Sequence, residues 1–255
     1  MSFELLTVPC LSIRDRFLAH DADTMVTLLV DAPEPEPILC KLKEKSWVLT
    51  HVLLTHHHWD HVDGLSKLLE YYSPQIIGSS SDTERLPPIH LPVRENDEIK
   101  IGNNVGTVFE VSGHTIGHIA IYFEESKLLF SADSLMALGC GRLFEGTAGQ
   151  MWHSLQKLST LPNDTILCSG HEYTETNSNF ALTIDPKNQD LITRHKNIKK
   201  LRSEGIPTVP STMNEEKNTN PFLRPWCKEI RANLDMIEAT DEEVFTKIRA
   251  LKDAY

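Results

Sequence analysis

The sequence predicts an α/β domain followed by a smaller α-helical domain. Short apolar runs separated by turns fill residues 1–172, a pattern typical of β-strands. Strand signals then end, and helical patterns dominate residues 173–255. A chain of 255 residues with 40% hydrophobic residues is long enough to bury such a core. We therefore place the predicted domain boundary between residues 172 and 173.

The apolar runs of the first domain give its predicted strands. The clearest are 25–30, 48–54, 105–111, 119–123, 128–130 and 166–168. A helix is predicted after Gly64, where four apolar residues recur at the i, i+3, i+4 and i+7 spacing of one helix face. The residues between the strand 48–54 and this helix therefore form a strand-to-helix loop.

The second domain has two predicted helices and a long connection. Residues 190–205 have the composition of a helix that ends at a glycine, whereas residues 209–226 are rich in Pro, Asn and Ser and are predicted to be a loop. Thr240 and Glu243 have the spacing of a capping box. They predict a final helix that ends near Asp253.

Composition limits the class of partner and the cellular location. The net charge of -11, from 36 acidic and 25 basic residues, argues against nucleic acid and anionic membranes as partners. The start "MSFELLTVPC" has no basic n-region, and no run approaches the roughly 18 apolar residues that span a bilayer. Five scattered cysteines without a CxxC pair predict neither disulfides nor a thiolate zinc site. We expect a cytoplasmic monomer that acts on a small molecule.

The segment "THHHWDH" places four histidines and an aspartate directly after an apolar strand. Imidazole nitrogens and carboxylate oxygens are ligands suited to zinc, iron or manganese. His56 and His58 are two apart in an extended loop and should project to the same side, whereas His57 should point away and have a structural role. Asp60 and His61 lie where the chain turns into the helix and can face a second metal. A solvated loop or a tag is disfavoured because the segment is internal and follows a buried-strand pattern.

Three further polar residues follow apolar runs. His114 follows "TVFEVSG", Asp133 follows "KLLFSA" and His171 follows "TILCSG". Each alone is more often a turn or cap residue. Together with the four residues of the first segment they make a set that two metal ions sharing one carboxylate would require, if each ion keeps an open position for water.

The motifs "THHHWDHVDG", "SGHTIGHI", "SADS" and "CSGHEYT" resemble the metallo-β-lactamase superfamily. The resemblance implies an αββα sandwich with two metals at the edge of its two sheets. It assigns the ligands as follows: His56, His58 and His114 for one metal, Asp60, His61 and His171 for the other, and Asp133 as the bridge.

Within this superfamily the stretches "GCGRLFEGT", "HEYT", "VPST" and "NPFLR" resemble the type II glyoxalases, the hydroxyacylglutathione hydrolases. The similarity covers nearly the whole chain, including the helical domain that in this family binds the substrate. Arg142 and Phe144 stand where many members carry lysine and tyrosine. The substrate-binding residues implied by the resemblance are Arg142, Phe144, Tyr173, Arg249 and Lys252.

The resemblance implies hydrolysis of the thioester S-D-lactoylglutathione to D-lactate and glutathione, a step of methylglyoxal detoxification. Two divalent metal ions per chain are expected, with zinc favoured and iron or manganese as alternatives. Metal coordination generates hydroxide at neutral pH, and Asp60 and Asp133 are expected to orient this metal-bound hydroxide as catalytic residues.

Other functions of the same fold are the alternatives. A β-lactamase would usually carry cysteine in place of Asp133, and a nuclease would need a basic arm. Another hydrolase or lactonase of this fold, or a non-catalytic protein that binds glutathione or metal, is the remaining alternative. Thioester turnover with two bound metals would separate an enzyme from a binding protein.

Overall fold

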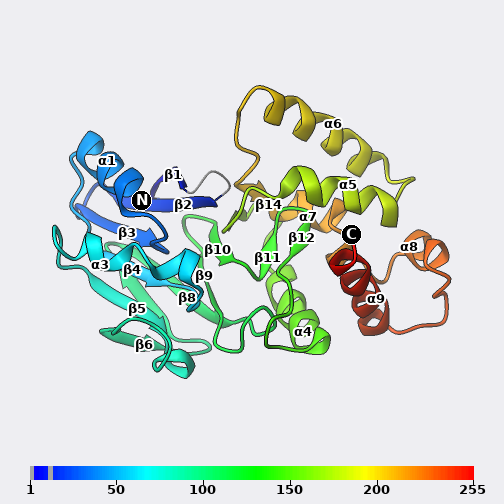
Figure 1. Ribbon diagram of the computed structural model, residues 1–255, viewed down its shortest axis with the longest axis horizontal. Coiled ribbons are helices and arrows are strands. Elements are labelled where there is room, and N and C mark those ends of the chain that lie inside the picture. The colour runs from blue at the N-terminus through cyan, green and yellow to red at the C-terminus, as the bar shows by residue number, and fades with distance from the viewer. Residues whose placement is uncertain (1–2, 11–13) are drawn as a thin grey trace. The chain divides into compact units, whose positions relative to one another are not determined.

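The computed structural model describes residues 3–10 and 14–255 (Figure 1). Its internal contacts divide the chain into two compact units. The first unit is Met1–Glu110 with Gly117–Ser131, and the second unit is Val111–Ile116 with Ala132–Tyr255. These limits are set by contacts in space, whereas the boundary after residue 172 was predicted from composition, so the two differ. The boundary after residue 172 therefore remains a prediction.

The first sheet lies in the first unit and has a mixed arrangement. Its strands, in spatial as well as chain order, are β1 (Glu4–Cys10), β2 (Arg14–Asp21), β3 (Val26–Val30), β4 (His51–Leu54), β5 (Gln75–Ser79) and β6 (Leu91–Val93). The strands β1, β2 and β3 are antiparallel, whereas β3 to β6 run parallel. The carboxyl ends of the parallel strands therefore meet at one edge of the sheet.

Helices cover one face of this sheet (Figure 1). The helical segments of the first unit are α1 (Pro35–Lys45), α2 (Trp59–Val62), α3 (Leu65–Leu68) and the 3-10 turn η1 (Ser80–Asp82). Ile38 and Leu42 of α1 and Leu65 of α3 are buried in one cluster with apolar residues of β2, β3 and β4. The loop between β4 and α3 is therefore held at both ends by buried apolar residues.

The second sheet of the first unit faces the first. Its strands are β7 (Glu98–Ile101), β8 (Asn104–Glu110), β9 (Ile119–Phe123) and β10 (Leu128–Ala132), and neighbours in this order are antiparallel. The rings of Phe17 on β2 and Phe130 on β10 have centroids 6.0 Å apart. The backbone N–H of Asn103 donates to Asp21 Oδ2 at 2.6 Å. The first unit is thus a helix layer on two packed sheets.

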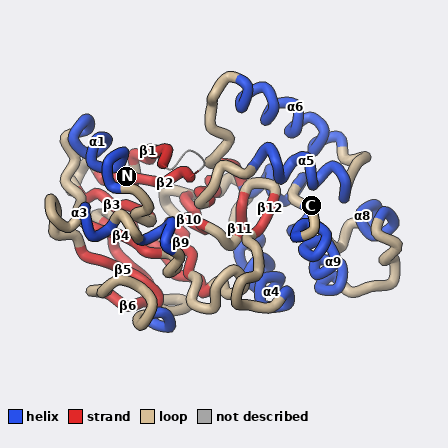
Figure 2. The backbone as a smooth tube through the Cα atoms, in the orientation of Figure 1, coloured by secondary structure: helices blue, strands red, loops and turns tan. Residues whose placement is uncertain are grey.

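Helices predominate in the second unit (Figure 2). Its elements are β11 (Leu135–Met136), β12 (Gly139–Cys140), α4 (Ala148–Ser159), β13 (Ile166–Ser169), α5 (Thr174–Ile184), α6 (Gln189–Ser203), β14 (Ser211–Thr212), α7 (Met213–Thr219), the 3-10 turn η2 (Pro221–Leu223), α8 (Lys228–Asn233) and α9 (Asp241–Asp253). Trp152 of α4 packs on Phe245 of α9 at 5.6 Å, and Phe245 meets Phe222 of η2 at 5.9 Å. These three aromatic rings pack together in the core beside α9.

Several predicted elements are confirmed, with shifted ends. The strand predicted over 119–123 is β9, and the helix predicted over 190–205 is α6. The strand predicted from residue 48 begins at His51, because Val48 is exposed and the Thr50 side chain bonds the backbone of Thr27. All five cysteines are free. In the described part of the chain no helix is long and apolar enough to cross a membrane.

The loop predicted over 209–226 is wrong in its middle part. The helix α7 occupies Met213–Thr219, because Thr212 and Glu215 form a complete capping box at its start. The helix was not predicted because the surrounding Asn and Pro residues are typical of loops. The same device opens α9, where the predicted box of Thr240 and Glu243 is confirmed.

The carboxylate of Glu216 on α7 joins several elements of the second unit. It is fully buried, and one oxygen accepts from Arg194 of α6 and from the Ser211 hydroxyl. The other accepts from the Leu138 backbone N–H at 2.7 Å and from Asn220 Nδ2 at 3.1 Å. Glu216 therefore holds the β11–β12 hairpin to α6 and α7.

Glu216→Ala should destabilise the protein by about 3 to 5 kcal/mol, because it leaves Arg194, whose side chain is only 9% exposed, without its counter-ion and several donors without an acceptor. Urea denaturation followed by circular dichroism measures this free energy. Glu204→Ala, at the exposed end of α6, is the control and should change stability by less than about 0.5 kcal/mol. Similar stability losses in both variants would contradict this role of Glu216.

Candidate functional site

The first cluster of predicted metal ligands lies in the loop after β4. His56 and His61 are fully buried, and His58 and Asp60 are half-buried. His56 Nε2 lies 3.1 Å from His58 Nδ1, and His61 Nε2 lies 3.9 Å from Asp60 Oδ2. A ligand atom of His56 also lies within 4.8 Å of one on His61. The loop therefore gathers all four side chains into one group.

His57 lies between these residues but contacts a different carboxylate. Its Nδ1 is 2.9 Å from Asp82 Oδ2, and Asp82 also accepts from Arg85. Successive side chains of an extended segment point to opposite sides, which explains why His57 and its neighbours diverge. The contact with Asp82 fits a structural role for His57.

Asp31 holds the first cluster from the end of β3. Its Oδ2 accepts from His61 Nδ1 at 2.7 Å, and its Oδ1 accepts from the Thr55 backbone N–H at 2.8 Å. Since β3 and β4 are parallel neighbours, Asp31 and Thr55 leave the sheet side by side. Sequence reasoning missed Asp31, although its position after the apolar run "VTLLV" is the same signal that identified Asp133 and His114.

Two further residues fix the loop. Arg16 on β2 is buried, and its Nη2 donates to the Asp60 backbone carbonyl at 2.7 Å. Gly64 lies so close to the segment after β3 that an added Cβ would be 2.9 Å from the Ala32 carbonyl oxygen. Any other residue at this position would therefore push the loop away from the sheet edge. Neither residue was identified from the sequence as part of the site.

The second cluster lies in the second unit and contains His114, Asp133 and His171. All three are buried. Asp133 Oδ2 is 3.1 Å from His171 Nε2 and 3.5 Å from His114 Nε2. One carboxylate oxygen thus lies between two imidazole nitrogens that come from distant points of the chain.

The backbone after β12 orients this cluster. His114 Nδ1 lies 2.8 Å from the Arg142 carbonyl oxygen, which can only accept, so Nδ1 carries the proton. Gly141 passes so close that an added Cβ would be 2.0 Å from the Asp133 carbonyl oxygen and 2.9 Å from His114 Nδ1. Only glycine at position 141 lets the backbone lie this close to both Asp133 and His114.

The hydrogen-bond pattern of both clusters fits divalent cations. Because Nδ1 of His61 donates to Asp31 and Nδ1 of His114 donates to Arg142, each neutral ring presents the lone pair of Nε2 toward a carboxylate. A lone pair and a carboxylate oxygen repel each other unless a proton or a metal cation lies between them. Neutral imidazole and carboxylate are also the donor set of zinc, iron and manganese.

The predicted substrate residues lie in the second unit, and Arg249 is the most enclosed. Its side chain is only 6% exposed. Nη1 donates to the Cys140 carbonyl oxygen at 2.9 Å, Nη2 donates to Asp253 Oδ1 at 3.0 Å, and the guanidinium lies over the Phe222 ring. Arg249 therefore binds the β12 strand and Asp253 directly, rather than projecting into solvent.

The other predicted substrate residues are more accessible. Arg142 and Phe144 have exposed side chains, and the Phe144 ring meets His114 at 5.3 Å. Tyr173 is 38% exposed and stacks on His171 at 4.7 Å. Phe144 and Tyr173 therefore each border a predicted metal ligand.

Lys252 is half-buried on α9, with Nζ 5.0 Å from the Phe180 ring centre and 5.1 Å from that of Tyr255. Burial, with a smaller contribution from the charge of Arg249, lowers the pKa of Lys252 to about 8. The ammonium group is therefore largely charged at neutral pH and loses its charge just above it.

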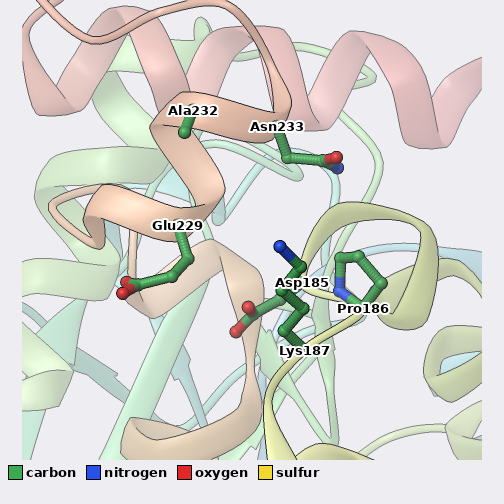
Figure 3. A pocket seen from close by; sticks show the side chains of 6 residues that line it. All are labelled: Asp185, Pro186, Lys187, Glu229, Ala232 and Asn233. Atoms are coloured by element: carbon green, nitrogen blue, oxygen red, sulfur yellow. The ribbon is translucent and has the colours of Figure 1, made fainter.

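A cavity of about 310 Å³ lies elsewhere in the second unit, between the end of α5 and α8 (Figure 3). Its lining consists of Asp185, Pro186, Lys187, Glu229, Ala232 and Asn233. The Asp185 carboxylate is already paired with Arg224 and Asn188. None of the predicted site residues lines this cavity.

Comparison with known proteins identifies the family. The model described as Metallo-beta-lactamase superfamily matches residues 21–171, and that described as Hydroxyacylglutathione hydrolase C-terminus matches residues 172–255. A hydroxyacylglutathione hydrolase of Ruegeria pomeroyi is 54% identical over 100% of both chains, and one of Roseobacter denitrificans is 52% identical over the same share. The crystal structure of ETHE1 from Myxococcus xanthus matches with a TM-score of 0.66 and 24% identity, covering 100% of this chain and 99% of that chain.

These matches confirm the predicted fold class, the αββα metallo-β-lactamase fold with a C-terminal α-helical domain. Identity above 50% over the whole length of both chains also confirms the predicted family. The chain belongs to the hydroxyacylglutathione hydrolase family of the metallo-β-lactamase superfamily.

Proposed function

We propose that this protein hydrolyses the thioester S-D-lactoylglutathione to D-lactate and glutathione. The full-length relatives named hydroxyacylglutathione hydrolase support this activity. The observation that carries it is the buried Asp133 carboxylate, with an imidazole nitrogen of His114 and one of His171 next to the same oxygen. This is the arrangement that a carboxylate shared by two metal ions would need.

The proposed metal centre takes its ligands from both clusters, because each cluster alone has too few for two ions. His56, His58 and His114 would hold one divalent cation, and Asp60, His61 and His171 the other, with Asp133 shared. The donor set accepts zinc, iron or manganese. Zinc is our choice, because three neutral imidazoles at the first position suit it well.

The bound cations would supply a nucleophile derived from water at neutral pH and would polarise the thioester carbonyl. Asp133 and Asp60 provide the negative charge that keeps two cations close, and their carboxylate oxygens can accept the hydrogen bond that orients the attacking water. Asp31 and the Arg142 carbonyl keep His61 and His114 in the tautomer that presents Nε2. The leaving glutathione thiolate is stable enough to need little general-acid help.

The substrate residues divide by exposure. The exposed Arg142 and the half-buried Lys252 are cations suited to the carboxylates of glutathione, and Phe144 and Tyr173 offer ring surface beside His114 and His171. The buried Arg249 has a positioning role, through its bonds to the Cys140 carbonyl and Asp253. We keep the cytoplasmic location, the monomeric state and the role in methylglyoxal detoxification as part of the same proposal.

Thioester turnover combined with metal analysis tests the proposed function. Purified protein should contain about two metal equivalents per chain and hydrolyse S-D-lactoylglutathione. Asp133→Asn should lose metal and at least about a hundredfold in turnover, because the neutral amide cannot offset two adjacent cations. The control Asp235→Asn changes an exposed residue with a left-handed backbone, which asparagine adopts easily, and should keep both properties. An Asp133→Asn variant with full metal and full activity would refute the shared carboxylate.

The metal loop gives a second prediction. His57→Ala should keep the metal content, because the Asp82 carboxylate retains Arg85 as its partner. His58→Ala should lose at least one metal ion per chain. Inductively coupled plasma mass spectrometry of both variants provides the comparison, and equal losses of metal would show that our assignment of the loop residues is wrong.

The pKa of Lys252 predicts how substrate affinity depends on pH. Below about pH 8 the ammonium group is charged and attracts a substrate carboxylate, and as the pH rises through 8 this attraction is lost. The KM for the thioester should therefore increase between pH 7 and pH 9 while kcat changes less, because the carboxylate contact is distant from the reacting carbonyl.

Lys252→Arg is the matched variant, since a guanidinium stays charged throughout this range. The ratio of its KM to that of the parent should fall as the pH rises, and this ratio cancels any titration of the substrate itself. Lys252→Gln should show a raised KM at pH 7 and a smaller pH dependence than the parent. A constant ratio between parent and Lys252→Arg would exclude Lys252 as the titrating group.

A further inference from the structure

Asp253, the last residue of α9, contacts two of the predicted substrate cations. Its Oδ1 accepts from Arg249 Nη2 at 3.0 Å and from Arg142 Nε at 3.2 Å. Its backbone carbonyl also accepts from Arg142 Nη2 at 3.3 Å. One carboxylate of the protein therefore occupies donors that a carboxylate of the substrate would use.

The position of Asp253 is not explained by the stability of α9. A helix C-terminus has a partial negative charge, so an aspartate in the last turn is electrostatically unfavourable there. Lys252 in the same turn already provides the cation that a helix end prefers. The favourable interactions of the Asp253 charge are therefore its bonds to Arg142 and Arg249.

The contact between Asp253 and Arg142 is exposed enough to be exchanged. The side chain of Asp253 is 36% exposed and that of Arg142 is 57% exposed. Ion pairs with this much exposure contribute only roughly 0 to 1 kcal/mol, because water solvates both partners. A carboxylate brought by a ligand can therefore replace Asp253 at Arg142 at small cost.

We propose that Asp253 is an affinity-determining residue, an internal carboxylate that competes with the glycine carboxylate of glutathione for Arg142. This inference rests on the proposed function. Asp253 weakens binding in two ways: it occupies the donors in the free protein, and its charge repels the ligand carboxylate in the complex. The result is weaker binding of substrate and product and faster release of glutathione.

Isothermal titration of glutathione into Asp253→Asn tests this inference. Asparagine keeps the size of the side chain and one acceptor but removes the charge. We expect Kd to fall about two- to fivefold relative to the parent, which corresponds to removal of one competing exposed ion pair. An unchanged or higher Kd would overturn the inference, because it would mean that Asp253 orients the cations for the ligand or has no effect on it.

A second ligand separates competition from a general change of structure. In glutathione amide the glycine carboxylate is replaced by a neutral amide, so the competition disappears and Asp253→Asn should change its Kd by less than about twofold. The preference for glutathione over glutathione amide should therefore be larger in the variant than in the parent. Equal gains for both ligands would refute competition for the carboxylate.

Three further variants complete the design. Asp241→Asn removes the same charge from the start of α9, about 18 Å away at 1.5 Å per residue, and should leave both Kd values unchanged. Asp253→Glu keeps the charge and should resemble the parent. Asp253→Ser removes the charge with a different side chain and should resemble Asp253→Asn, so a folding defect of one variant does not decide the result.

Parent kinetics separate the two proposals. A parent that neither binds glutathione nor hydrolyses the thioester would refute the proposed function together with this inference. A parent that does both, with no tighter binding by Asp253→Asn and Asp253→Ser, would refute the role of Asp253 alone.

Discussion

A buried imidazole nitrogen that faces a carboxylate is the constraint on which the functional part of this protein depends. In the first unit it arises at His61 and Asp60, and in the second unit at His114 and Asp133. With neutral rings both arrangements are unfavourable unless a proton or a metal cation lies between the two groups, because two electron-rich groups repel each other. A divalent cation removes this repulsion and turns both groups into ligands. The proposed chemistry thus follows from the same contacts that would be costly without metal.

One side-chain carboxylate and one backbone carbonyl maintain these ring orientations. Asp31 and the Arg142 carbonyl accept from the far nitrogen of each ring, so the lone pair cannot rotate away from the metal position. Parallel strands β3 and β4 bring Asp31 beside the histidine loop, and Gly141 allows the chain to pass within contact of Asp133. Arg142 consequently has two functions: its carbonyl orients a predicted metal ligand, and its side chain belongs to the predicted substrate site.

The candidate ligand residues can be recognised in the sequence because they form a dense local motif or follow apolar strands, and both signals are local. The sequence does not reveal Arg16 or Gly64, because an arginine in a strand or a glycine in a loop acquires its meaning only from a partner distant in the chain. The helix α7 was missed because its capping box lies among loop-forming residues. The burial of Arg249 was also not predictable, since a basic helix face is usually solvated and only the packing against Phe222 encloses it.

That burial changes how the substrate residues work together. A guanidinium enclosed to this degree needs an anionic or carbonyl partner, because an unpaired buried charge is strongly destabilising. The Cys140 carbonyl and Asp253 satisfy this need, which places an acid beside the cations that we propose bind the anionic substrate. Affinity for the substrate is then the difference between two similar ion pairs rather than the full strength of one. A hydrolase whose product keeps the same carboxylate benefits from this arrangement, since the internal acid replaces the product as readily as the substrate replaced the acid.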